Sequence, residues 1–411
     1  MRAEIIATGS ELLSGGVLDT NSLYLSEELL DLGIETAFKT VVGDSEKDME
    51  EAIRHALGRV DTVLITGGIG PTEDDITRKV VAKITKRRLV LNDDALKAIK
   101  SALAAKSRNY LSANDRQALI PAGAKLIPNP VGVAPGFTMA EEGKFLAVLP
   151  GVPEEMRAMF SSGLKTALEG QIENRSFLQR RILRTCGMSE SAVNQAIQDV
   201  MKRENPAVGL VAGPGGVDIR IVARGGSLER SHAAIERTEA ELRQLLGDVV
   251  YGIGDRELEE VVGALMVQRG QTLAVAESCT GGLIGAKITN VPGSSRYFER
   301  GVVVYSNASK SGLLGIPDDL IGRFGAVSRE TAGAMAEGIR QAAKTDLGIG
   351  VTGIAGPDGG SADKPVGLVF IALASSSGVK VNEHRFLGNR DQVRMKAAQA
   401  ALDMVRRHLI G

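Results

Sequence analysis

Tryptophan is absent from the 411-residue sequence, and all aromatic residues together make up only 3% of it. The two cysteines, Cys186 and Cys279, lie far apart, and neither belongs to a Cys-x-x-Cys motif. The sequence therefore indicates neither a disulfide framework nor a cysteine-based zinc site. The four histidines form no His-x-x-x-His pair, which argues against a histidine-based metal site and weakens a Ser-His-Asp triad.

Excess charge and long apolar runs are also missing. Lys plus Arg number 49 and Asp plus Glu number 50, so the formal net charge is -1, and no global basic field indicates nucleic acid or membrane. No segment approaches the roughly 18 uninterrupted apolar residues of a membrane helix. The first residues lack the apolar stretch of a signal peptide. We therefore expect a cytoplasmic protein without a nucleic-acid or membrane partner.

Three parts are predicted along the chain, because two or three domains of about 100–200 residues fit this length. Strand and helix signals alternate in residues 1–168, which predicts an α/β domain with a parallel sheet and helices on both faces. Residues 175–252 predict a small α+β unit, and α/β alternation returns in residues 255–411.

The individual elements follow from apolar spacing and from the turn residues between them. The predicted strands are residues 5–7, 34–41, 62–66, 145–149, 177–183, 207–211, 217–222, 272–276, 301–305, 347–351 and 367–373. The predicted helices are residues 21–32, 45–57 (capped by Ser45), 93–105, 189–201, 228–246, 257–268, 283–289, 332–343 and 392–409.

The motif with the clearest chemistry is Ala276-Glu277-Ser278-Cys279-Thr280-Gly281-Gly282, which lies between a predicted strand and a predicted helix. A nucleophile at Ser278 would be exposed at the carboxyl end of the sheet, where α/β proteins bind ligands. The helix start offers unpaired N–H groups to an oxyanion or a phosphate. Gly281 and Gly282 allow a substrate to approach the backbone closely, with Thr280 in the same turn.

Lys310 is a candidate base for Ser278, in the first turn of a helix that follows the strand ending at Tyr305. Lysine can accept a proton from serine only when it is neutral, which requires burial or a nearby cation. Tyr305 could complete the hydrogen-bond relay. The structural alternative is a capping serine and a solvated lysine. Cys279 is a rival nucleophile, because a thiolate is intrinsically stronger than serine.

Two further segments predict contacts with an anion. The strand at residues 347–351 runs into the glycine-dense segment 352–360, which can wrap a phosphate or an oxyanion or can be a simple turn. Gly353 is our candidate for an oxyanion donor. Arg394, in the first turns of the last helix, suits bidentate recognition of phosphate or carboxylate, with a surface salt bridge as the alternative.

A second glycine-rich turn follows the predicted strand at residues 62–66. Its candidate ligand-binding residues are Gly67, Gly68, Gly70 and Thr72, followed by the acidic residues Glu73, Asp74 and Asp75. Such a turn can cradle a phosphate, and the carboxylates suggest a hard cation beside it, although acidic residues also stabilise helix starts. The spacing fits neither Gly-x-Gly-x-x-Gly nor a P-loop.

Four segments occur in one order in the last part of the chain: residues 276–282, 291–295, 305–307 with Lys310, and 351–357. They resemble the C-terminal domain of the CinA family, which contains bacterial nicotinamide mononucleotide deamidases. The resemblance implies a Ser/Lys amidohydrolase without a cofactor, in which Ser278 attacks the carboxamide and Lys310 is the base. It also implies that Tyr305 and Thr352 support the active site and that Arg394 binds substrate.

The first part of the chain resembles the MoaB/MogA-like molybdopterin-binding fold in residues 8–16, 19–21, 42–44, 67–75, 129–136 and 149–151. This fold forms the N-terminal half of CinA proteins, where it is associated with metal-dependent hydrolysis of ADP-ribose. The resemblance places Asp44 and Asp75 on the two functional aspartates of the molybdopterin enzymes. We expect a divalent ion of open identity at Glu11, Asp44, Asp74 and Asp75. Asn21 is expected to bind substrate.

The middle part resembles the KH-like insert of full-length CinA proteins. Its segment Gly213–Gly216 joins two predicted strands rather than two helices, so we expect no nucleic-acid binding. The resemblance and base rates also favour a homodimer. Two alternatives remain: a non-enzymatic nucleotide- or molybdopterin-binding protein linked to competence or DNA damage, and a molybdopterin-processing enzyme.

Overall fold

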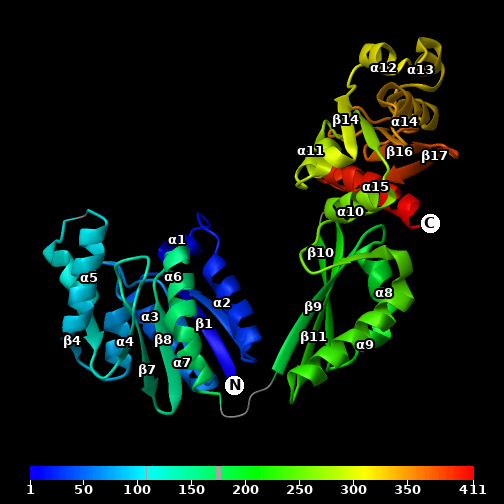
Figure 1. Ribbon diagram of the computed structural model, residues 1–411. Coiled ribbons are helices and arrows are strands. Elements are labelled where there is room, and N and C mark those ends of the chain that lie inside the picture. The colour runs from blue at the N-terminus through cyan, green and yellow to red at the C-terminus, as the bar shows by residue number, and fades with distance from the viewer. Residues whose placement is uncertain (108, 173–176, 214) are drawn as a thin grey trace. The chain divides into compact units, whose positions relative to one another are not determined.

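The computed structural model describes residues 1–107, 109–172, 177–213 and 215–411 (Figure 1). They form two compact units, Met1–Gln179 with Arg224–Ser231, and Arg180–Ala223 with His232–Gly411. The predicted start of the middle part at residue 175 and Pro214 of its predicted turn lie outside the described residues. No described helix is long and apolar enough to cross a membrane.

A six-stranded sheet forms the centre of the first unit, in the order β2-β1-β3-β8-β7-β6. Four strands are parallel neighbours, whereas β7 runs antiparallel to both β8 and β6. The strands are β1 Arg2–Thr8, β2 Glu35–Val42, β3 Thr62–Thr66, β6 Lys125–Ile127, β7 Gly136–Glu141 and β8 Lys144–Leu149. A separate pair joins β4 Leu89–Leu91 to β5 Leu119–Pro121.

The prediction of a parallel sheet is therefore correct for β1, β2, β3 and β8 and wrong for β6 and β7. A tight turn reverses the chain between β7 and β8, where Glu142 and Gly143 both have positive φ. Two-residue turns of this kind match the twist of antiparallel strands. Glu-Gly is a weaker sequence signal than Asn-Gly, which is why the hairpin was not predicted.

Helices lie on both faces of this sheet, as predicted. The α-helices of this unit are α1 Ser10–Leu13, α2 Thr20–Asp31, α3 Glu46–Arg59, α4 Thr77–Ile84, α5 Asp93–Ala105, α6 Pro153–Met159 and α7 Lys165–Glu169. Ser45 caps α3 as predicted, because its side chain accepts from the amide of Asp48. Alternate residues of β1 enter different cores: Ile5 packs with α2, and Ile6 with α3.

The middle part is a four-stranded sheet in the order β10-β11-β9-β12 with two helices. Its elements are β9 Phe177–Thr185, α8 Glu190–Met201, β10 Ala207–Gly213, β11 Gly216–Gly225, α9 Leu228–Leu246 and β12 Val250–Ile253. Apolar residues of both helices, such as Ile197 and Leu242, pack on the sheet in one core. The α+β prediction is confirmed, with β12 as an unpredicted strand.

The last part contains a five-stranded sheet in the order β14-β13-β15-β16-β17. The first three strands are parallel, and the β15-β16-β17 portion is antiparallel. The strands are β13 Leu273–Glu277, β14 Phe298–Val303, β15 Leu347–Gly353, β16 Leu368–Ser375 and β17 Gly378–Arg385. The strand predicted to end at Tyr305 thus ends two residues earlier.

Six helices among the described residues cover the two faces of this sheet (Figure 1). They are α10 Leu258–Arg269, α11 Leu283–Thr289, α12 Asn307–Leu314, α13 Asp318–Phe324, α14 Arg329–Ala343 and α15 Arg390–Ile410. Leu273 and Val275 of β13 pack on the side of α10 and α15, and Ala274 and Ala276 on the side of α14. The strand before Ser278 is therefore enclosed on both faces.

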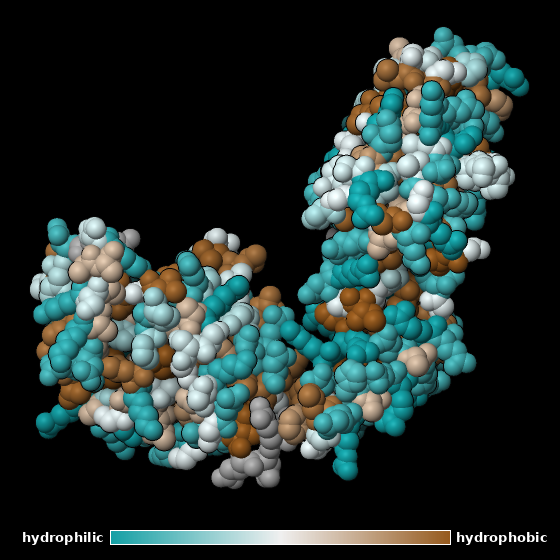
Figure 2. Space-filling view, viewed as in Figure 1, coloured by the Kyte–Doolittle hydropathy of each residue, from teal (hydrophilic) through white to brown (hydrophobic). Residues whose placement is uncertain are grey.

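The surface of each unit is mainly polar, with hydrophobic side chains gathered in places (Figure 2). One such area in the first unit contains exposed large side chains on α1, on α2 and on the segment between them. They are Leu13, Val17, Leu18 and Leu23. These residues follow β1 and therefore lie near the carboxyl edge of the sheet.

Helix α14 packs closely on the sheet at Gly350 of β15. A Cβ atom there would lie 2.4 Å from the Ala332 carbonyl oxygen and 2.5 Å from the Ala336 amide nitrogen. We expect Gly350→Ala to lower the free energy of unfolding by about 1–3 kcal/mol, because backbone atoms must move apart. Gly322→Ala in α13 is the matched control, because nothing lies within 4 Å of its Cβ position. Urea unfolding of both variants makes the comparison, and equal stabilities would contradict the expectation.

Candidate active site

Ser278 follows β13 directly and begins the turn that leads to α11. Its amide donates to the Val351 carbonyl of the neighbouring strand β15 at 3.0 Å, which fixes the residue at the carboxyl edge of the sheet. The residue is 8% exposed, so it is enclosed but reachable. This is the position that the sequence predicted for a nucleophile.

Lys310 lies beside Ser278 although 32 residues separate them. The Nζ atom of Lys310 is 3.2 Å from Ser278 Oγ, 2.9 Å from the Val304 carbonyl oxygen and 3.2 Å from that of Tyr305. The lysine is 1% exposed, and this burial lowers the pKa of its amine below the ordinary 10.5. The alternative of a solvated lysine is therefore wrong.

The three contacts of Lys310 suit a neutral amine. Carbonyl oxygens only accept hydrogen bonds, so two N–H groups of Lys310 point at Val304 and Tyr305. In the neutral form the remaining position on the nitrogen is a lone pair, to which the Ser278 hydroxyl can donate. Lys310 can thus accept the serine proton without rearranging its other contacts.

Helix α12 sets the position of Lys310. Ser306 caps this helix, because its side chain accepts from the amide of Ser309. The cap begins the helix immediately after the end of β14, and Lys310 falls in its first turn. The sequence Ser306-Asn307-Ala308-Ser309-Lys310 therefore directs the lysine back toward the sheet edge.

Glu277 has a role that the sequence did not reveal. It is 1% exposed, and its carboxylate accepts from the amides of Ile284 at 3.1 Å and Gly285 at 2.9 Å. Two N–H groups at the start of α11 are therefore taken, which corrects the expectation that they are open to an oxyanion or a phosphate. A carboxylate is favourable there because the helix N-terminus is positive. The Glu277 carboxylate thus links the end of β13 to the start of α11, on either side of the turn that contains Ser278.

The glycines of the turn have the backbone freedom that the sequence predicted. Gly281 has φ 61° and Gly282 has φ 90°, in the left-handed region that favours glycine. Thr280 is fully buried, and its hydroxyl has no hydrogen-bond partner among the described residues. Its carbonyl oxygen accepts from Arg394, from Nε at 3.3 Å and from Nη2 at 3.0 Å. The Thr280 side chain is therefore enclosed by protein, whereas a residue that binds substrate through its side chain would be exposed in the site.

Tyr305 contacts Lys310 through its backbone rather than its side chain. Its hydroxyl accepts from Nη2 of Arg390 at 3.1 Å, and the residue is 62% exposed. Arg390 also donates from Nη1 to the Gly356 carbonyl at 2.7 Å. Arg390 is a residue that our sequence reasoning passed over, because an arginine at a helix start gives no signal by itself.

Thr352 and Gly353 end β15 next to the nucleophile turn. Thr352 is 1% exposed, and its hydroxyl donates to the Ala326 carbonyl at 2.7 Å, so it fixes the segment before α14. At Gly353, a Cβ atom would lie 2.6 Å from the Leu368 carbonyl oxygen. The position therefore leaves no room for a side chain.

Cys279 is a poor rival to Ser278. Burial raises the pKa of its thiol to about 12, so the thiolate is scarce at neutral pH. Ser278 has a base at hydrogen-bond distance, which makes it the stronger candidate nucleophile.

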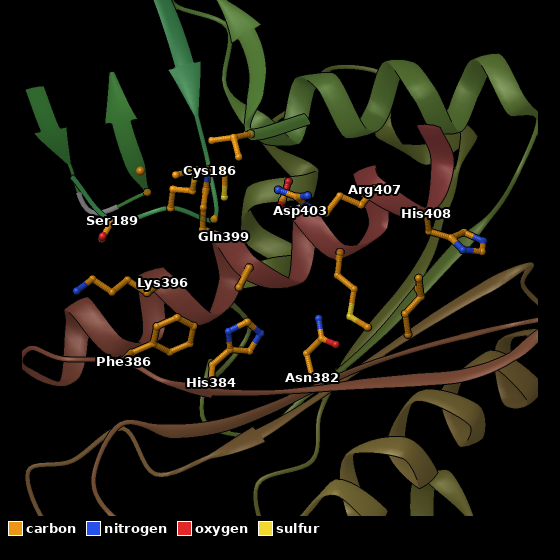
Figure 3. A pocket seen from close by; sticks show the side chains of 18 of the residues that line it. Cys186, Ser189, Asn382, His384, Phe386, Lys396, Gln399, Asp403, Arg407 and His408 are labelled. Atoms are coloured by element: carbon orange, nitrogen blue, oxygen red, sulfur yellow. Dashed lines mark hydrogen bonds and ion pairs between the residues drawn. The ribbon is translucent and has the colours of Figure 1, made fainter. Parts of the chain in front are cut away.

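A cavity of about 1130 Å³ lies elsewhere in the second unit (Figure 3). One wall consists of residues at the start of α8 and at the β10-β11 turn, and the other comes from β17 and α15. It contains the ion pair of Asp403 and Arg407, with 2.7 Å between Oδ2 and Nε. Neither Ser278 nor Lys310 lines this cavity, so its size does not identify the catalytic site.

In the first unit, the glycine turn packs closely against its neighbours. Gly67 has φ 112° and Gly68 has φ 65°, and the Thr77 hydroxyl donates to the Gly67 carbonyl at 3.0 Å. Asn21 is 8% exposed and donates to Thr66 Oγ1 at 2.9 Å and to the Gly151 carbonyl at 2.8 Å. Its side-chain oxygen has no partner among the described residues. Asn21 thus reaches the edge at which β3 and β8 end.

Two of the four expected metal ligands accept hydrogen bonds from local partners instead. Asp44 accepts from the Ser10 amide at 2.9 Å, and Asp75 accepts from the Thr72 amide at 2.8 Å and its hydroxyl at 2.6 Å. The Glu11 carboxylate folds back over Gly9, and Asp74 is exposed. Within the ranges that the structure describes, no three His, Cys, Asp or Glu side chains are grouped to hold a metal ion. Glu11, Asp44, Asp74 and Asp75 thus do not fit a divalent ion in this arrangement.

Together these features define an α/β protein with a buried Ser-Lys pair at a sheet edge. Three family models match the chain one after another. They are "Probable molybdopterin binding domain" at residues 4–170, "Damage-inducible protein CinA KH domain" at 180–252 and "CinA C-terminal domain" at 255–409. A CinA-like protein of Dictyoglomus turgidum is 41% identical over 411 residues, covering all of both chains. The chain belongs to the CinA family.

Solved structures with similar sequence are also known. The competence/damage inducible protein CihA from Agrobacterium tumefaciens is 40% identical, with a TM-score of 0.36, and the match covers 38% of this chain and 94% of that one. The protein CinA with unknown function from Thermoplasma acidophilum is 35% identical, with a TM-score of 0.38, covering 40% and 98%.

Burial of Lys310 predicts a pH-dependent contribution to stability. Its pKa is lower in the folded protein than the ordinary 10.5. Between these two values the unfolded chain binds more protons, so the free energy of unfolding should rise with pH in that window. Lys310→Met should remove this contribution. The measurement is urea unfolding of both proteins from pH 7 to 11, where parallel pH curves would show that Lys310 keeps its ordinary pKa.

Proposed function

We propose that the C-terminal domain hydrolyses the carboxamide of nicotinamide mononucleotide to give nicotinic acid mononucleotide and ammonia. The observation that carries the proposal is the 3.2 Å contact between Ser278 Oγ and the buried Nζ of Lys310. The choice of substrate follows from the resemblance of residues 255–411 to domains that deamidate this nucleotide. The chain's membership of the CinA family supports that choice.

The proposed reaction has two halves. Ser278 Oγ attacks the carboxamide carbon while its proton passes to Lys310 Nζ, and the resulting tetrahedral species carries a negative oxygen. When the C–N bond breaks, Lys310 returns the proton to the leaving nitrogen, and ammonia departs. Water then attacks the acyl-serine ester with Lys310 as base again, releasing the carboxylic acid and restoring Ser278.

Stabilisation of the negative oxygen needs backbone donors near Ser278. The amides of Ile284 and Gly285 are already bound to Glu277, so the start of α11 supplies neither of them. Gly353 is the proposed donor, because it ends the strand beside Ser278 and has no side chain to block an approach.

A second function in the first unit is proposed as binding of a nucleotide or a pterin. The observation that favours it is the side-chain oxygen of buried Asn21 at the carboxyl edge of the sheet, which has no hydrogen-bond partner in the described part of the chain. Metal-dependent hydrolysis of ADP-ribose stays a prediction, and no step is derived through a metal there. The homodimer, the cytoplasmic location and the absence of nucleic-acid binding also stay predictions.

Removing the catalytic pair should abolish ammonia release. We expect Ser278→Ala to lower kcat by about 10⁴-fold or more, because a nucleophile and its base act as a unit. Lys310→Met should lower kcat by about 10²–10⁴-fold, the usual contribution of a general base. Ammonia release from nicotinamide mononucleotide is measured in a coupled assay, and circular dichroism checks that each variant is folded.

Cys279→Ser is the matched control for the nucleophile, because it changes the adjacent side chain and leaves Ser278 in place. This variant should keep activity within a few-fold of the wild type. An inactive Cys279→Ser together with an active Ser278→Ala would assign the nucleophile to the thiol. A folded wild type without any deamidase activity would favour the alternative of a non-enzymatic binding protein.

The rate should depend on pH through Lys310. Only the neutral amine can take the Ser278 proton, and the neutral fraction grows as pH rises through the lowered pKa. We expect kcat/KM for nicotinamide mononucleotide to rise with pH and to level off below pH 10.5. A flat profile from pH 6 to 10 would count against Lys310 as the base.

A further inference from the structure

Arg390 carries a positive charge, and its hydrogen-bond partners among the described residues are neutral. Its two terminal nitrogens donate to the Gly356 carbonyl at 2.7 Å and to the Tyr305 hydroxyl at 3.1 Å, and both acceptors are uncharged. Within the part of the chain that the structure describes, Arg390 forms no ion pair. The residue is exposed, so a ligand can reach it.

A line of contacts connects Arg390 to the catalytic pair. Arg390 binds the hydroxyl of Tyr305, the carbonyl of Tyr305 accepts from Lys310, and Lys310 contacts Ser278. The length of the tyrosine side chain therefore separates the guanidinium from the reacting atoms. A mononucleotide has the same layout, with a carboxamide at one end and a phosphate at the other.

Arg394 is placed differently. Its Nε and Nη2 donate to the carbonyl of Thr280, two residues after the nucleophile, and its Nη1 lies 3.6 Å from Asp391 Oδ1. Its contact with Thr280 suits an anchor for the turn at residues 278–282. Part of its charge is also balanced by a carboxylate, unlike that of Arg390.

We propose that Arg390 binds the phosphate of the substrate and so selects a 5′-phosphorylated nucleotide over the free nucleoside. A guanidinium binds phosphate oxygens more strongly than a neutral phenol, so phosphate replaces the Tyr305 hydroxyl on Nη2. Arg394 is a positioning residue for the turn at residues 278–282. This inference rests on the proposed deamidase function.

The test compares two substrates that differ only in the phosphate: nicotinamide mononucleotide and nicotinamide riboside. Arg390→Gln should raise KM for the mononucleotide by about 10- to 100-fold, because a hydrogen bond to a charged group is lost. The same variant should leave kcat/KM for the riboside unchanged. Arg390→Lys, which keeps the charge without the bidentate fork, should recover part of the loss.

Arg385→Gln is the matched control, because this exposed arginine of β17 contacts Glu383 and lies outside the catalytic contacts. It should leave both substrates unaffected. Tyr305→Phe removes the hydroxyl contact while keeping the charge of Arg390, so it should retain the preference for the phosphorylated substrate.

Equal losses on both substrates in Arg390→Gln would show a structural role and overturn the inference. A phosphate-specific loss in Arg394→Gln but not in Arg390→Gln would overturn it as well. In both cases the wild type still releases ammonia, so the proposed function survives. A wild type inactive on nicotinamide mononucleotide would overturn the proposed function and this inference with it.

Discussion

The burial of one amine organises the candidate active site. The Lys310 side chain is buried, and its hydrogen-bond partners among the described residues are two carbonyl oxygens and a hydroxyl. Without a countercharge, burial favours the neutral amine, which is the form that can act as a base. The end of β14, the Ser306 cap and the start of α12 all serve to hold this nitrogen at Ser278. The other side of the site, the turn after β13, is held by Glu277.

Local patterns predicted much of this arrangement. The strand before Ser278, the glycine turn and the helix start each leave a signal within a few residues, and all three occur where the sequence placed them. The contact between Ser278 and Lys310 depends on two parallel strands ending side by side, so the residues alone left a solvated lysine as an alternative, and the family resemblance favoured the pair. Glu277 reaches the amides of Ile284 and Gly285 only because the chain turns back after β13, and the contacts of Arg390 with Gly356 and Tyr305 join distant segments. No local pattern encodes either arrangement.

The first unit shows that a sequence motif does not by itself define a metal site. Asp74 and Asp75 follow a glycine turn, as the ligands of a cation would, but Asp75 binds Thr72, and Asp44 of an earlier segment binds Ser10. Short acidic side chains readily accept hydrogen bonds from nearby backbone, and such contacts stabilise loops. The sequence can show that carboxylates are present, whereas only the fold shows whether they converge. The hairpin strand β7 is absent from the sequence prediction for a different reason, because its turn, Glu142-Gly143, lacks a strong signal.

The enclosure of β13 affects how the position of Ser278 can be lost on unfolding. Strand β13 lies between two hydrophobic cores, since its alternate side chains enter one or the other. Strands enclosed in this way open mainly when the whole cooperative unit opens. The nucleophile at the end of β13 therefore belongs to the most persistent part of the domain, and local fraying at the surface leaves it in place. Loss of the catalytic serine's position and global unfolding of the domain become a single event.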